Sequence, residues 1–183
     1  SQFEDIALFN GLQLLTAKPV MYVCNVGEED AATGNAYSER VAARATEEGA
    51  ITVVISAAIE AEIAQLTDLE ERAEFLESIG LETTGLSQIL AAGYQLLGLI
   101  TYLTAGPTES RAWTITEGMK APQAAAVIHT DFERGFICAE IIAFDDYISC
   151  KGEVGAKEAG KMRQEGRDYI VKDGDIILFR FNV

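Results

Sequence analysis

The chain has 183 residues, of which 49% are hydrophobic and 23% are charged, and its net charge at pH 7 is −15. This composition is typical of a folded globular protein and argues against a disordered chain. Because DNA and RNA are bound mainly through Lys and Arg, the acidic balance disfavours a protein that binds nucleic acid over its whole surface, although a local basic patch could exist.

Membrane and metal functions also find little support in the sequence. No segment reaches the roughly 18 consecutive apolar residues that read as a membrane span, and no secretory signal begins the chain. Cys24, Cys138 and Cys150 are far apart, and His129 is the one histidine. We therefore expect no zinc site, no disulfide framework and no membrane partner, and we expect a reducing cytoplasm as the location.

The first elements in chain order are a helix and a buried strand. Apolar residues recur at helical spacing between residues 2 and 17, so this segment is interpreted as the end of an amphipathic helix. Pro19 ends it. The apolar run at residues 20–24 then predicts a strand that is buried on both faces, as in a parallel sheet covered by helices.

A helix and a second strand complete a β-α-β unit over residues 20–55. Residues 36–48 are expected to form a helix that Gly49 ends, with Tyr37, Val41 and Ala45 facing inward. Residues 51–55 are apolar and β-branched, which favours another buried strand. Such a unit closes with its two strands parallel.

Two more helices are expected before the sequence changes from helical to strand-like patterns near residue 100. Residues 60–79 are interpreted as one acidic helix with a stripe of Leu66, Leu69, Ala73 and Leu76, and residues 84–98 as an apolar helix. The C-terminal pattern then indicates a small mixed-sheet domain of the β-grasp, or ubiquitin-like, type. Its expected elements are strands at 100–104, 111–115, 136–144, 169–171 and 176–181, a helix at 122–128, and a turn at 172–175.

Two loops at one edge of the expected parallel sheet could bind a nucleotide base. Asn25 follows the first strand and Ser56-Ala57 follows the second, and ligands bind at the carboxyl ends of parallel strands. An Asn carboxamide offers donors and an acceptor that can bind a purine edge. The same residues also suit an ordinary capping Asn and a small-residue turn, and their spacing alone does not decide between the two interpretations.

Several motifs together resemble the YchF, or Obg-like ATPase, family over essentially the whole chain. In the N-terminal half these are Lys18-Pro19-Val20-Met21-Tyr22-Val23-Cys24-Asn25-Val26-Gly27-Glu28 and Ile55-Ser56-Ala57-Ala58-Ile59-Glu60-Ala61-Glu62. In the C-terminal half they are Arg111-Ala112-Trp113-Thr114-Ile115, Pro122-Gln123-Ala124-Ala125, Ile128-His129-Thr130-Asp131-Phe132-Glu133-Arg134-Gly135-Phe136, Asp173-Gly174-Asp175 and Phe179-Arg180-Phe181-Asn182-Val183.

The resemblance implies a domain order and a function. The fold would be α/β, with residues 1–17 ending a helical insertion, residues 18–98 forming the C-terminal part of a P-loop GTPase-like (OBG-type) parallel-sheet domain, and residues 99–183 forming a β-grasp TGS domain. It implies an intact protein that binds ATP with Mg²⁺, hydrolyses ATP to ADP and phosphate, and associates with the ribosome or RNA. The phosphate loop and the magnesium ligands would lie upstream of Ser1, so we expect this chain alone to be inactive.

The resemblance places the base pocket at Asn25, Val26, Glu28, Ser56 and Ala57. Guanine-specific relatives carry Asn-Lys-x-Asp, whose Asp accepts two hydrogen bonds from guanine. Here Val26 replaces Lys and the longer Glu28 replaces Asp. Because losing paired polar contacts costs about 1–3 kcal/mol each, we expect the guanine preference to be lost in favour of ATP, with adenine contacts from Asn25 and the Val26 backbone.

One other string superficially resembles a phosphate loop. It runs from Gly155 to Lys161 but is followed by Met162, which has no hydroxyl group for Mg²⁺. No buried strand leads into the string, and its centre consists of helix-forming residues. We therefore expect a solvated helix at residues 155–161 and no catalytic residue or metal ligand in this chain.

The rival hypothesis is a β-grasp module that binds RNA or protein and uses nucleotide only as a switch. Its candidate surface consists of His129, Arg134, Lys157, Lys161, Arg163 and Arg167. The four cations from residue 157 onward could meet ribosomal RNA or could simply balance Glu158 and Glu165; a DNA partner is not expected. Cys24 directly precedes Asn25, which gives the further hypothesis that its oxidation perturbs base binding, although a buried strand cysteine is usually inert.

Overall fold

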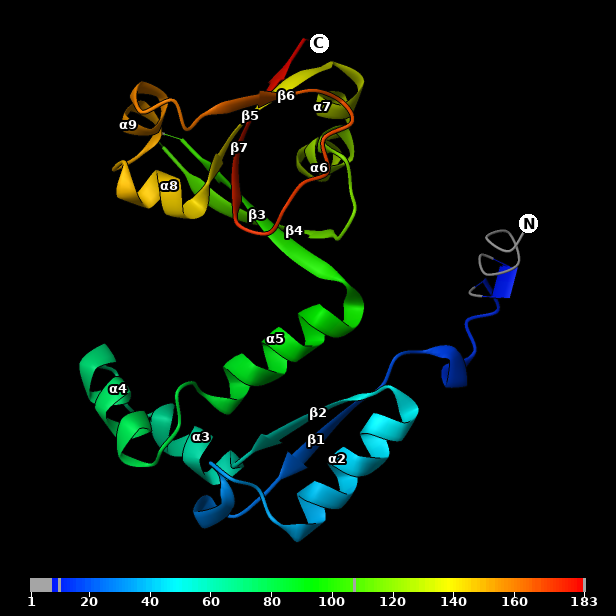
Figure 1. The fold of residues 1–183 in the computed structure, drawn as a ribbon, viewed down its shortest axis with the longest axis vertical. Helices are drawn as coiled ribbons and strands as arrows, with labels where there is room; N and C mark the ends of the chain where they lie inside the picture. The colour runs from blue at the N-terminus through cyan, green and yellow to red at the C-terminus, as the bar shows by residue number, and fades with distance from the viewer. Residues whose placement is uncertain (1–7, 10, 107, 183) are drawn as a thin grey trace. The chain divides into compact units, whose positions relative to one another are not determined.

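The computed structural model describes residues 8, 9, 11–106 and 108–182 (Figure 1). The chain divides into two compact units, Ser1–Leu97 and Gly98–Val183, and each is described by itself. Of the helix expected at residues 2–17, residues 2–7 and 10 lie outside the described residues, and the described part is interrupted at Gln13, whose φ is +51°. Its last part is a short 3₁₀ helix, η1, at Leu15–Ala17.

The first unit is built on a β-α-β arrangement, which confirms the order expected for residues 20–55. Strands β1 (Met21–Asn25) and β2 (Ile51–Ile55) pair in parallel, with Asn25 opposite Ile55 at the last position. Helix α2 (Ala36–Glu48) connects them. The Asn35 side chain caps its first turn, and Gly49 ends it in the left-handed conformation at φ +68°.

The expectation that these strands are buried on both faces is wrong. Helices α2 and α5 both contact the two strands, yet Val23 in β1 is 43% exposed and Tyr37 on α2 is 77% exposed. Among the described residues the sheet has only these two strands, so the outer edge of β1 has no neighbour. The sequence pattern of a buried strand is therefore present without the elements that would bury it.

The acidic segment after β2 forms two helices instead of the single helix expected at residues 60–79. Helix α3 is Ala57–Ile63 and helix α4 is Leu69–Ser78. The chain breaks between them because Asp68 begins a new helix, accepting hydrogen bonds from the backbone N–H groups of Glu70 and Glu71. Leu69 is consequently 76% exposed and Leu76 is buried. Between β1 and α2 lies a 3₁₀ turn, η2 (Glu28–Asp30), and helix α5 (Gly85–Leu97) ends the unit.

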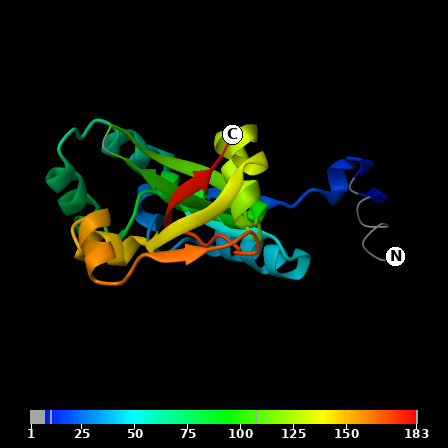
Figure 2. The same ribbon diagram turned by 90° about the horizontal axis from the view of Figure 1, so that it is seen from above.

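The second unit is a five-stranded mixed sheet in the order β4-β3-β7-β5-β6. Its strands are β3 (Leu99–Ala105), β4 (Ser110–Thr116), β5 (Phe136–Ala143), β6 (Arg163–Glu165) and β7 (Asp175–Phe181). Strand β7 is parallel to β3, and the other pairs are antiparallel. Figure 2 shows β5 in yellow beside β7 in red. The α/β class expected from the sequence is confirmed.

Four short helices accompany this sheet. They are α6 (Ala121–Ile128), α7 (Thr130–Arg134), α8 (Phe144–Ser149) and α9 (Glu153–Glu158). The core forms where α6 packs on the sheet, and Tyr102 is its largest fully buried side chain. The Tyr102 hydroxyl donates to the carbonyl oxygen of Ala124 at 2.9 Å, which satisfies the buried polar group. No described helix is long and apolar enough to span a membrane.

Residues 169–171 do not form the strand expected from their apolar pattern. They make a single bridge, between Ile170 and Lys120, and the short strand β6 instead forms at residues the sequence pattern did not single out. The expected turn at 172–175 is present. The buried Asp175 carboxylate accepts from the Tyr169 hydroxyl at 2.8 Å and from the Lys172 N–H at 2.9 Å, and Gly174 adopts φ +76°.

Candidate nucleotide-binding site

The two loops expected to form the base pocket are joined by a direct hydrogen bond. The Asn25 Oδ1 atom, at the end of β1, accepts from the backbone N–H of Ala57 at 2.9 Å. The parallel register sets this contact, because Asn25 and Ile55 lie opposite each other and α3 begins two residues after Ile55. The carboxamide of exposed Asn25 therefore keeps its Nδ2 group, a donor, for a ligand.

The backbone of Val26 is less available than expected. Its N–H donates to the carbonyl oxygen of Ile55 at 2.9 Å, which extends the β1–β2 ladder by one step. Only the carbonyl oxygen of Val26 is left as a backbone contact for a base. An adenine contact through the Val26 N–H would require this bond to break.

Ser56 occupies the N-cap position of α3 but its hydroxyl does not cap the helix. The residue is 4% exposed, and its Oγ atom has no hydrogen-bond partner among the described residues. An unsatisfied buried hydroxyl costs free energy, so a group that supplied a partner to Ser56 would be favoured. Among the five residues assigned to the base pocket, Ser56 is the one with a buried side-chain oxygen that lacks a hydrogen bond within the described residues.

Glu28 and Cys24 flank the loop in different environments. Glu28 begins the turn η2 and its side chain is exposed. Cys24 is half-buried in β1 and is a free thiol.

The residues expected to form the base pocket do not all line the same cavity of the first unit. Asn25 and Val26 line a cavity of about 360 Å³ that also includes Tyr22 and Tyr37. Ala57 lines a separate cavity of about 730 Å³ between α3, α4 and the start of α5. The Asn25–Ala57 hydrogen bond thus joins residues that line two different cavities, and neither of these two cavities encloses all five residues.

His129 and Arg134 lie at the two ends of α7. The His129 Nδ1 atom accepts from the backbone N–H of Asp131 at 3.2 Å, so His129 acts as the cap of α7. The Asp131 carboxylate lies 3.4 Å from the same atom. Arg134 is exposed in the last turn. A structural role therefore accounts for His129, while Arg134 is open to a partner.

The four cations expected to form a basic cluster have mostly internal partners. Lys161 pairs with Asp146 at 3.2 Å and Arg163 lies 3.8 Å from Glu165. Arg167 donates to the carbonyl oxygen of Phe136 at 3.2 Å and to that of Glu133 at 3.4 Å. Exposed Lys157 on α9 has no ion pair among the described residues. Residues 155–158 belong to α9, so the string from Gly155 to Lys161 does not form a phosphate loop.

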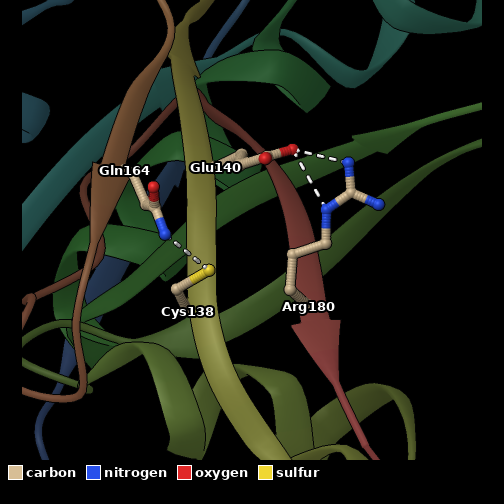
Figure 3. A network of polar contacts seen from close by, with 4 residues as sticks. All are labelled: Cys138, Glu140, Gln164 and Arg180. Carbon is tan, nitrogen blue, oxygen red and sulfur yellow. Dashed lines mark hydrogen bonds and ion pairs between the residues drawn. The ribbon is translucent and has the colours of Figure 1, made fainter.

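The sequence interpretation missed a polar network on β5, β6 and β7, shown in Figure 3. Arg180 donates through Nη2 and Nε to one oxygen of Glu140, at 2.8 and 3.2 Å, and this carboxylate raises the pKa of the guanidinium. Gln164 Nε2 lies 3.2 Å from the Cys138 sulfur. The alternation along β5 puts Cys138 and Glu140 on one face and predicts their proximity, but the partners Gln164 and Arg180 require the strand order.

Comparison with known proteins places these features in a family. The family described as YchF-GTPase_C (protein of unknown function, DUF933) matches residues 99–182. A Haemophilus ducreyi protein named Ribosome-binding ATPase YchF is 57% identical over 98% of this chain, and its Bacillus subtilis namesake is 51% identical over 98%. The chain belongs to the YchF family. The Rattus norvegicus protein Obg-like ATPase 1 is 43% identical over 98% of the chain.

Solved structures agree with this assignment. The Schizosaccharomyces pombe YchF GTPase structure matches 97% of the chain with a TM-score of 0.84 at 37% identity. A GTP-binding protein of Pyrococcus horikoshii matches 90% with a TM-score of 0.62 at 19% identity, which shows a shared fold. The chain spans about half the length of the relatives it matches, covering 49% of the H. ducreyi protein, 50% of the B. subtilis protein and 47% of the S. pombe chain.

Proposed function

We propose that this chain carries the base-binding part of an ATP site, and that a protein of the length of its YchF relatives uses it to hydrolyse ATP to ADP and phosphate. The observation that carries the proposal is the 2.9 Å hydrogen bond between Asn25 Oδ1 and the Ala57 N–H. This bond holds the two loops together and orients the amide so that Nδ2 is left to donate to a purine nitrogen. The name of these relatives, ribosome-binding ATPase, supports the same activity.

Base choice follows from Glu28. A carboxylate that accepts two hydrogen bonds from guanine must lie at a fixed depth, and the extra methylene of Glu28, together with its exposed position on η2, misplaces it. Asn25 Nδ2 and the Val26 carbonyl oxygen are the donor and acceptor that an adenine ring can use. The site therefore favours ATP over GTP.

The proposal concerns the base-binding half of such a site. The described residues contain no group of three or more His, Cys, Asp or Glu side chains that could hold a metal ion. We derive no catalytic step through Mg²⁺. By itself the chain is expected to bind ATP weakly and not to hydrolyse it.

The C-terminal unit is proposed as a TGS domain that contacts the ribosome or RNA in the cytoplasm, with residues 18–98 as the end of the nucleotide-binding domain. The difference in net charge between the two units supports this assignment of separate roles. Residues 1–97 carry 4 basic and 16 acidic side chains, a net charge of −12, whereas residues 98–183 carry 10 and 13, a net charge of −3. Polyanions are therefore repelled less by the second unit, where Arg134 and Lys157 are exposed.

The decisive experiment measures ATP and GTP affinity by calorimetry in a family-length protein that contains this chain. We expect Asn25→Ala to weaken ATP binding about tenfold or more, since it removes a base contact and the tie to Ala57. Glu62→Ala, an exposed change on the neighbouring helix α3, is the control and should leave affinity unchanged. Glu28→Asp should raise GTP affinity relative to ATP. A strong GTP preference in the unmodified protein would sink the proposal.

Ribosome association is tested separately by co-sedimentation. The double change Arg134→Glu and Lys157→Glu should reduce binding and its salt dependence. If both cations can be reversed without effect, the contact lies elsewhere.

A further inference from the structure

A large cavity in the first unit shares one residue, Ala57, with the proposed nucleotide site. It lies between α3, α4 and the start of α5 and has a volume of about 730 Å³, which is within the usual range for small-molecule pockets. Most of its wall is apolar, formed by Ile55, Ile63, Leu76, Leu86 and Ile89. Such a wall would bind the hydrocarbon part of a ligand.

One cation lines this cavity. Arg72, on α4, donates from Nη2 to the carbonyl oxygen of Leu66 at 2.8 Å, while its Nε is buried and lacks a hydrogen-bond partner among the described residues. No described carboxylate forms an ion pair with it, although the unit carries 16 acidic side chains. A guanidinium with an unsatisfied buried donor favours an anion that can accept from it.

The carboxylate that lines the same cavity is already engaged. Glu60 accepts from the backbone N–H groups of Gly85 at 2.6 Å and Leu86 at 3.2 Å, and so caps the start of α5. Glu60 thus serves helix α5 and is not the partner of Arg72. The charge of Arg72 remains available to a ligand.

We propose that this cavity binds a small amphipathic carboxylate, with its head group on Arg72 and its hydrocarbon tail along the apolar wall. A guanidinium matches a carboxylate in geometry and charge. A doubly charged head group such as a phosphate monoester is disfavoured, because one cation faces it in a unit of net charge −12. The inference stands on the cavity itself and needs no nucleotide.

The test uses decanoate with the 183-residue chain and follows isoleucine methyl signals by NMR. Decanoate should shift the Ile63 and Ile89 signals and leave Ile115, in the core of the second unit, unchanged. It should bind about tenfold more tightly than decanol, which has the same tail without the charge. Decyl phosphate should bind more weakly than decanoate.

Substitution separates the head group from the tail. Arg72→Met keeps much of the side-chain stem and should weaken decanoate about tenfold while leaving decanol unchanged. The matched control is Arg40→Met, an exposed arginine on α2 that lines a different cavity. If R72M does not fold, the comparison of decanoate with decanol in the unmodified chain decides.

Three results would overturn the proposal. They are equal binding of decanoate and decanol, unchanged decanoate affinity in R72M, and shifts of Ile63 and Ile89 that follow protein concentration instead of ligand. The last result would identify the cavity as a contact between two copies of the chain.

Discussion

At the scale of single residues, Gly135 is held against the end of the chain. A Cβ atom at this position would overlap the carbonyl oxygen of Asn182, and the two residues are also joined by the Asn182 N–H donating to the Gly135 carbonyl at 2.9 Å. Because the obstacle is backbone, no side-chain movement relieves it. Gly135→Ala should therefore destabilise the second unit by about 1–3 kcal/mol, as overpacking does.

This change has a close control in the same unit. Gly166 has nothing within 4 Å of an added Cβ, so Gly166→Ala should leave stability within about 0.5 kcal/mol. Urea unfolding followed by the fluorescence of Trp113, the one tryptophan, measures both. Equal midpoints for the two variants would contradict the close approach at Gly135.

A second prediction at this scale concerns Tyr169 and the stability of the fold at alkaline pH. Burial, together with its hydrogen bond to the Asp175 carboxylate, raises the pKa of Tyr169 to about 12. In the unfolded chain the phenol loses its proton near pH 10, so the stability that depends on this group is complete below pH 10 and is lost as the pH rises toward 12. Tyr102 acts in the same direction, because burial raises its pKa.

Tyrosinate absorbance at 295 nm checks this behaviour. Tyr169→Phe should remove one phenol from the late part of the titration and leave the early part unchanged. The variant should also lose less stability than the unmodified chain between pH 10 and 12. Loss of an early phenol instead would show that the Asp175 contact does not hold in solution.

At the scale of elements, Glu60 links two helices through its carboxylate. Its side chain extends from α3, and the carboxylate accepts hydrogen bonds from the backbone N–H groups of Gly85 and Leu86 at the start of α5. The first N–H groups of a helix have no partner within that helix. Glu60→Ala should cost about 1–2 kcal/mol and speed amide exchange at the start of α5. Glu62→Ala on the same helix is the control, since its side chain is exposed. Faster exchange in both variants would assign the effect to α3 itself.

Elements were predictable where their signals are local. Residues 36–48 are predictable as a helix because Gly49 is adjacent to its end, and Gly49 acts as expected; the cap at Asn35 is a finding of the structure. Burial was not predictable in the same way. The exposure of Val23 and Tyr37 depends on what lies beyond β1, and the gap between α3 and α4 depends on Asp68 competing for the helix start.

The candidate site shows the same division. The parallel register brings Asn25 to Ala57, as the β-α-β pattern implied, so the proximity of the two loops was within reach of the sequence. The hydrogen bond from the Val26 N–H to the Ile55 carbonyl was not predictable from the sequence, because it depends on the β1–β2 ladder continuing one step beyond the strands. Similarly, the charge of Arg167 suggested a binding surface, whereas its hydrogen bonds to the Phe136 and Glu133 carbonyls came from tertiary packing.

At the scale of the whole molecule, the two units differ in how much core they contain. The second unit has a five-stranded sheet and a cluster of 11 buried residues around Tyr102, whereas the main cluster of the first unit has 4, around Ile59. A two-stranded sheet is marginally stable without further packing, and β1 has no strand at its outer edge among the described residues. The units should therefore unfold separately, the first at lower denaturant.

Hydrogen exchange across a urea series measures this order. Amides of β1 and β2 should lose protection before the fluorescence of Trp113, in β4, reports unfolding of the second unit. Ile115→Ala should move only the later transition, by about 2–5 kcal/mol, and Ile59→Ala only the earlier one, because each side chain belongs to one core. A single transition that both variants shift equally would mean that the two units fold as one, and it would then be wrong to treat the base-binding loops and the C-terminal sheet as separable parts.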